Sequence, residues 1–92
     1  MSATDAPDPI YRELDTVVLT RDLPEAGLRA GDLGAVVLVY GPGAAPEGLE
    51  VEFVTAAGRT QALRTLGPAD VRPVRDDDLL AVRPAAAARS AA

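Results

Sequence analysis

The sequence of 92 residues predicts an all-β fold. Several segments alternate in hydropathy or are rich in β-branched residues, and Gly- and Pro-rich turns separate them. After the first such segment, a polar loop leads through Gly31 and Gly34 into a long apolar strand. A tight turn at 67–70 precedes the last short segment. This order predicts a small five-stranded SH3-like barrel over residues 14–75, with disordered termini.

We expect the strands at residues 15–20, 34–40, 49–54, 60–66 and 71–74. In the first strand, Val17 and Leu19 share the face that we place inward. The strand at 34–40 is apolar on both faces, with one row of Val36, Leu38 and Tyr40 and another of Ala35, Val37 and Val39. Because a barrel has one interior, one row lies outside and requires a cover: a terminal segment, a second copy or a partner.

The two ends of the chain are predicted to contribute little to the fold. Residues 1–13 form a disordered or weakly ordered tail, although Ile10, Tyr11 and Leu14 could pack on the open end of the barrel. Residues 76–92 form a short helical turn at 76–82, with aspartates favourably placed at its N-terminus, and then a disordered Ala-rich tail.

Composition excludes several functional classes. The chain has no cysteine, histidine or lysine, so it lacks a thiolate nucleophile, a Cys-based zinc site and the usual base near neutral pH. We therefore expect no enzyme activity, no metal and no cofactor. The net charge is −5 overall, and −2 over residues 14–75, which disfavours nucleic acid as a partner. No apolar run of about 18 residues and no secretory signal is present, so we expect a cytoplasmic protein without membrane contact.

Individual motifs also favour structural roles. Gly31 and Gly34 fit a turn with permissive backbone angles better than a phosphate loop, because a strand follows and lysine is absent. Asp32 is expected to accept backbone hydrogen bonds within that turn. Glu50 and Glu52 predict a solvated strand face or a site for a basic partner. We expect ion pairing across the sheet between these glutamates and four arginines, Arg59, Arg64, Arg72 and Arg75. The run 76–78 predicts a helix cap rather than a cation site.

A set of short motifs, in order and spacing, resembles the bacterial family called domain of unknown function 4926: Leu14-Asp15-Thr16-Val17-Val18-Leu19, Asp22-Leu23-Pro24, Gly31-Asp32-Leu33-Gly34-Ala35-Val36-Val37, Val51-Glu52-Phe53 and Asp70-Val71-Arg72-Pro73-Val74. The resemblance covers residues 14–74 and implies an SH3-like barrel with no catalytic or cofactor residues to carry over. The Gly-x-x-Gly-x-Val turn is also similar to ribosomal and transcription-factor modules. Those modules usually carry basic residues around the turn, where this chain has Asp32.

Together these observations predict a non-enzymatic binding module, an accessory or antitoxin-like protein that binds a protein partner. The partner would be a neighbouring-gene product or a second copy of the chain. The predicted contact residues are Val37, Val39, Tyr40, Glu50 and Glu52, while Gly31, Asp32 and Gly34 form the structural turn. The alternatives are a nucleic-acid or ribosome- and transcription-associated module, and a structural subunit of an enzyme complex.

Overall fold

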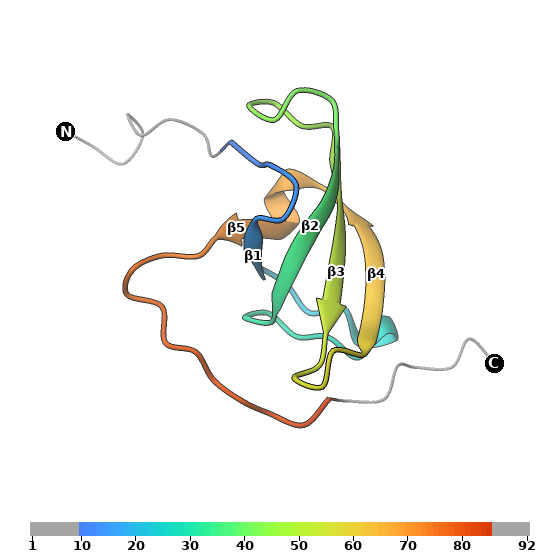
Figure 1. The fold of residues 1–92 in the computed structure, drawn as a ribbon, viewed down its shortest axis with the longest axis vertical. Coiled ribbons are helices and arrows are strands. Elements are labelled where there is room, and N and C mark those ends of the chain that lie inside the picture. The colour runs from blue at the N-terminus through green and yellow to red at the C-terminus, as the bar shows by residue number, and fades with distance from the viewer. Residues whose placement is uncertain (1–9, 86–92) are drawn as a thin grey trace.

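The structure is a computed structural model that describes residues 10–85. The predicted disorder of residues 1–9 and 86–92 lies outside the described residues. Between residues 10 and 85 the chain forms five strands, which Figure 1 labels, and two short 3₁₀ turns. In chain order they are β1 (Thr16–Leu19), η2 (Pro24–Ala26), β2 (Leu33–Tyr40), β3 (Gly48–Val54), β4 (Thr60–Leu66), η3 (Pro68–Asp70) and β5 (Val71–Pro73).

The strands form one antiparallel sheet in the order β4-β3-β2-β1-β5, which confirms the predicted all-β class. A closed barrel is not formed, because β4 and β5 end the sheet and no ladder joins them. The strand β5 has three residues and ends at Pro73, which has no N–H to extend a ladder. A side-chain contact links β4 to the first loop instead, where Gln61 Nε2 donates to the carbonyl of Ala26 at 3.2 Å.

The core lies inside the curled sheet. Val17 and Leu19 of β1 point inward as predicted, and the largest fully buried side chain is Phe53 of β3. The polar first loop contributes the buried apolar side chains of Leu23, Ala26 and Leu28. These residues belong to the same core cluster as Val17, Leu19 and Phe53.

Tyr11 also belongs to the core, so the ordered part of the chain begins before the predicted boundary at residue 14. Its N–H donates to the carbonyl of Gly43 at 3.0 Å, and its hydroxyl lies 3.5 Å from the carbonyl oxygen of Val71. Burial raises the pKa of this hydroxyl. Ile10 and Leu14, which were also expected to pack here, are exposed instead.

A β-bulge in β2 corrects the predicted faces of this strand. Val36 is paired with Val51 and Leu38 with Glu50, so Val37 is an extra residue between them. Because a bulge shifts the alternation by one residue, the inner row changes from Val36 to Val39 across it. Leu38 is therefore on the outer side, whereas Val36 is fully buried.

The helix expected at 76–82 is wrong. The chain makes a single turn at Asp76–Asp77, closed by the N–H of Asp78 donating to the carbonyl of Arg75 at 3.1 Å. Residues 78–85 then continue without regular structure. The Asp78 carboxylate accepts from the N–H of Arg75 and from Arg72, so it caps the turn from its C-terminal side rather than starting a helix.

The two glycines of the predicted turn are needed for different reasons. Gly31 has φ of +97°, in the region that L side chains rarely adopt. Gly34 has no positive φ. The prediction that Gly34 provides a permissive backbone angle is therefore wrong. A Cβ at Gly34 would lie 2.5 Å from Cγ1 of Val51 and 2.9 Å from Cε1 of Phe53. Gly34 therefore allows the close approach of β2 to these two core side chains.

We predict that Gly34→Ala destabilises the protein by about 2 kcal/mol, since the added methyl group overpacks the core against Val51 and Phe53. Urea unfolding followed by circular dichroism measures this change. The matched control is Gly48→Ala in β3, where the nearest atoms to a Cβ lie at 3.6 Å and the effect should stay within about 0.5 kcal/mol. Equal effects at the two positions would contradict the packing role of Gly34.

We predict that Leu14→Gly is more stable than Leu14→Ala by about 1 kcal/mol, because Leu14 has φ of +74° and an exposed side chain. Elsewhere in a fold, glycine is usually the less stable of these two residues. Thermal unfolding of the two variants, each compared with the unchanged chain, measures the difference. A more stable alanine variant would show that the backbone here is not left-handed.

Candidate functional site

The outer face of β2, β3 and β4 brings together three of the predicted contact residues, Tyr40, Glu50 and Glu52. We use the term outer face for Ala35, Leu38, Tyr40, Glu50, Glu52, Val54, Leu63 and Thr65, which point away from the core. The register places Glu50 between Leu38 and Thr65, and Glu52 between Ala35 and Leu63. The two acidic side chains of β3 are therefore flanked by Leu38, Ala35 and Leu63, which are apolar, and by Thr65.

Both carboxylate oxygens of Glu50 are held by hydroxyl groups. The Tyr40 hydroxyl donates to Oε2 at 2.9 Å, and the Thr65 hydroxyl donates to Oε1 at 2.8 Å. The hydrogen bond from Tyr40 to Glu50 is the main reason why the pKa of the Tyr40 hydroxyl is raised. Gly48 lies opposite Tyr40, and a Cβ there would be in ordinary contact with the ring. The two donors come from different strands, so they fix the Glu50 side chain in one orientation.

Glu52 is held in a similar way, because the Thr60 hydroxyl donates to its Oε2 at 2.7 Å. The two glutamates are two residues apart on one strand, which separates them by about 7 Å. Both are acceptors toward neutral donors, and neither is buried. This arrangement is suited to attracting a cationic group, whereas general acid–base chemistry would require burial or closer approach of the pair.

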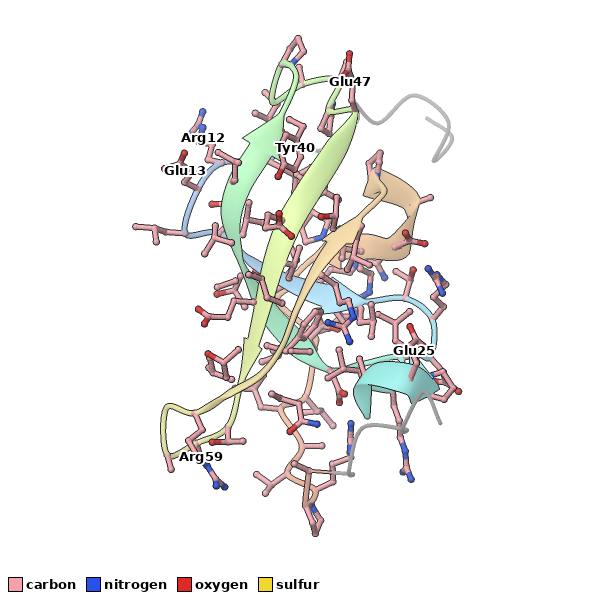
Figure 2. All side chains as sticks on the ribbon, turned by 90° about the vertical axis from the view of Figure 1, so that its right-hand side faces the viewer. Arg12, Glu13, Glu25, Tyr40, Glu47 and Arg59 are labelled. Atoms are coloured by element: carbon pink, nitrogen blue, oxygen red, sulfur yellow. The ribbon has the colours of Figure 1, made fainter. Side chains whose placement is uncertain are left out.

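The expected ion pairs between the arginines and these glutamates are absent from the part of the chain that the structure describes. The ion pairs there are Arg21–Asp70, Arg72–Asp78 and Arg83–Asp32. Arg64 donates to the carbonyl of Leu63, and Arg59 lies at the opposite end of the sheet from Tyr40 (Figure 2). Arg72 is unavailable because β5 is at the far edge of the sheet, where Asp78 engages it. The negative charge of the two glutamates is therefore not neutralised.

The outer face also exposes apolar side chains, of which Leu38, Val54 and Leu63 are each more than two-fifths exposed. Sequence reasoning did not select these three residues. The exposure of Leu63 could have been predicted, because Leu63 lies on the opposite face of its strand from the buried Ala62 and Leu66. The exposure of Leu38 could not, because the bulge at Val37 is not evident in the sequence. Val39, a predicted contact residue, packs against the core instead, and Val37 is exposed at the bulge.

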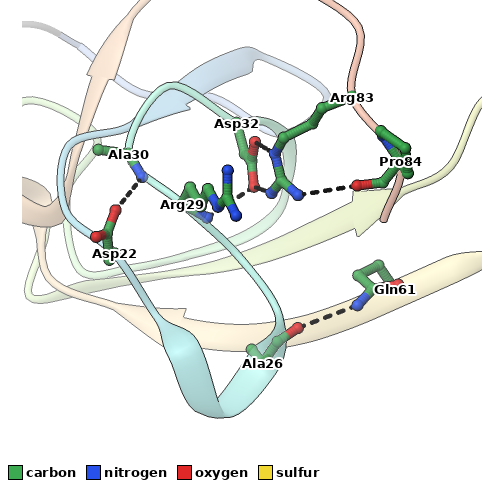
Figure 3. A network of polar contacts seen from close by, with 8 residues as sticks. All are labelled: Asp22, Ala26, Arg29, Ala30, Asp32, Gln61, Arg83 and Pro84. Atoms are coloured by element: carbon green, nitrogen blue, oxygen red, sulfur yellow. Dashed lines mark hydrogen bonds and ion pairs between the residues drawn. The ribbon is translucent and has the colours of Figure 1, made fainter. Parts of the chain in front are cut away.

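The turn before β2 confirms the predicted role of Asp32 and adds a contact that the sequence did not predict (Figure 3). Asp32 Oδ2 accepts from the N–H of Arg29 at 2.8 Å, and Asp22 supports the same loop by accepting from the N–H of Ala30 at 2.8 Å. The Asp32 carboxylate also forms an ion pair with the guanidinium group of Arg83. This contact attaches the C-terminal segment to the first loop.

We call residues 78–83 the strap. At its start, both carboxylate oxygens of Asp78 accept from the Arg72 guanidinium, at 2.8 and 2.9 Å, and at its end Arg83 pairs with Asp32. A cavity of about 770 Å³ lies between the strap, the first loop and the β3–β4 hairpin. Val18 points away from the core but is buried, and its ladder neighbours are Leu33 and Arg72. The strap and Val18 both line this cavity, whereas Val37, Leu38 and Tyr40 of the strand expected to need a cover are exposed.

The hydrogen bond and charge of Arg72 hold the pKa of Asp78 at about 2, helped by the N–H of Arg75. The folded protein holds the proton of the Asp78 carboxyl less tightly than the unfolded chain does. The stability that the Asp78–Arg72 contact contributes is therefore complete above pH 4 and is lost as the pH falls through 2. We predict that the carboxyl carbon of Asp78 titrates near pH 2 by NMR and that Arg72→Gln moves the midpoint toward the ordinary value of 3.8. An unchanged midpoint would exclude Arg72 as the main cause.

These features define a class: a small five-stranded β-module whose outer face combines fixed carboxylates with exposed apolar side chains. The family described as Domain of unknown function (DUF4926) matches residues 13–73. The chain belongs to this family, as the motifs between Leu14 and Val74 indicated. No curated protein and no solved structure matches the chain significantly.

Two further properties concern residues 10–85 alone. In that range no helix has the length and apolar character needed to cross a membrane. No group of three or more metal-ligating side chains of the His, Cys, Asp or Glu type comes together there. The aspartates at 76–78 are divided, since Asp78 turns toward Arg72 and the other two do not join it in an ion pair.

Proposed function

We propose that this protein is a non-enzymatic binding module that docks a partner protein on its outer face, as a cytoplasmic accessory or antitoxin-like protein. The observation that carries the proposal is the pair Glu50 and Glu52, held by hydroxyl groups and not neutralised by any described arginine. The partner surface that fits this pair presents arginine or lysine side chains beside apolar ones.

Two physical arguments support a protein partner. The hydroxyl donors fix the orientation of the carboxylates before binding, which reduces the conformational entropy lost when a cation arrives. Leu38, Val54 and Leu63 supply apolar area around the carboxylates, and burial of such area drives most protein association. An arginine of the partner could lie over the carboxylates while its neighbours cover the leucines.

Nucleic acid is the weaker candidate, because this face carries negative charge and the chain carries a net charge of −5. Three arginines of the described chain, Arg21, Arg72 and Arg83, are already engaged by carboxylates. A structural subunit of an enzyme complex remains compatible with the proposal, since such a subunit would use the same kind of contact.

A photo-crosslinking amino acid at Leu63, introduced into the full chain in its own host, tests whether this face binds a protein. We expect a discrete protein adduct from Leu63 and none from Glu25 in η2, an exposed position away from the outer face (Figure 2). Adducts that disappear after nuclease treatment, or equal adducts from both positions, would overturn the proposal.

The double variant Glu50→Gln and Glu52→Gln should bind the crosslinked partner at least tenfold more weakly, a loss of about 1.4 kcal/mol. The amide groups keep the size of the side chains and remove only the charge that attracts the cation. Isothermal titration with the purified partner measures the affinity, and Glu47→Gln in the loop before β3 is the matched control. Unchanged affinity of the double variant would exclude the carboxylates as the binding determinant.

A further inference from the structure

The strap combines exposed apolar side chains with an unpaired backbone. Leu79 is 95% exposed, Leu80 75% and Val82 100%. No backbone hydrogen bond joins residues 79–82 to any part of the chain between residues 10 and 85. Figure 1 shows the segment, in orange to red, passing outside the body of the fold. Exposed apolar side chains clustered in this way generally mark a contact surface.

Ion pairs at both ends hold this segment in place. Asp78 is bound by Arg72 through two hydrogen bonds, and Arg83 is bound by Asp32. Each of these four side chains is less than a third exposed, so the anchors are partly shielded from water. The four residues between the anchors are therefore presented as a short irregular segment, fixed at both ends before any binding.

The sheet offers a matching surface at β4. This strand ends the sheet, and its seven residues contain no proline and a single charged residue, Arg64. Natural sheets usually protect an edge of this length with charges, proline or a covering segment. Within the described residues, the backbone of 62–66 has no strand partner on the side away from β3.

Charges on the two surfaces are complementary. Arg59 and Arg64, in and beside β4, form no ion pair with the described acidic residues. Asp76 and Asp77, immediately before the strap, form none with the described arginines. A strap lying along β4 would bring the two negative charges of Asp76 and Asp77 close to the guanidinium groups of Arg59 and Arg64, which are not neutralised. Opposite charges across an interface raise the association rate and fix the register of the contact.

We propose that the strap of one copy adds as an extra strand to the edge of β4 in a second copy. Within one copy, the anchors attach the strap to β5, at the opposite edge of the sheet from β4, and to the turn before β2, so a strap along β4 would require the Asp78–Arg72 anchor to break. Between copies, both anchors are kept. Backbone hydrogen bonds along β4 and burial of the strap side chains then hold the two copies together.

Sedimentation equilibrium of the full chain, from micromolar to millimolar concentration, tests the proposal. We expect the mass to rise above the monomer mass of 9.5 kDa with concentration. Replacement of Leu79, Leu80 and Val82 by serine should weaken self-association at least tenfold without altering the circular dichroism spectrum, because these side chains are exposed. Ile10→Ser and Leu14→Ser, at exposed apolar positions elsewhere, should leave it unchanged.

A charge-exchange experiment distinguishes the β4 contact from any other use of the strap. Asp76→Arg with Asp77→Arg should weaken self-association at low salt, as should Arg59→Glu with Arg64→Glu. A mixture of the two double variants should restore association, because the reversed charges then match. A monomer at every concentration, serine variants that associate as strongly as the unchanged chain, or a mixture without recovery would overturn the proposal.

Discussion

The close approach of β2 to the side chains of Val51 and Phe53 is the constraint on which this fold depends. Gly34 makes that approach possible, since any larger residue would place its Cβ inside the contact distance of both side chains. Once Val51 and Phe53 face inward, the alternation along β3 places Glu50 and Glu52 on the opposite side of the sheet. The packing of the core and the position of the acidic pair therefore have the same origin.

The bulge at Val37 determines which apolar residues accompany the acidic pair. Without the extra residue, Leu38 and Tyr40 would continue the inner row of Val36. With it, Tyr40 lies beside Glu50 and donates a hydrogen bond to it, while Val39 packs on the core. One irregularity in one strand thus turns an apolar strand into part of a mixed, exposed surface.

Much of the fold could be predicted because its determinants are local. The alternation of residues 49–54, the glycine-rich turns and the 3₁₀ turn before β5 are evident in short windows of sequence, and all of them occur as expected. The bulge in β2 and the ion pair of Asp32 with Arg83 depend on residues far apart in the chain. The helix expected at 76–82 does not form for a local reason, because Arg72 and the N–H of Arg75 draw the Asp78 carboxylate into a turn.

The Asp32 carboxylate makes two separate contacts. Its bond to the N–H of Arg29 shapes the turn before β2, and its contact with Arg83 attaches the C-terminal segment. The hydrogen bond from Arg29 does not depend on the contact with Arg83, so loss of the Arg83 contact would leave the core and the sheet unaltered. Substitution of Arg83 would therefore remove the C-terminal attachment at this point while the hydrogen bond that shapes the turn before β2 is kept.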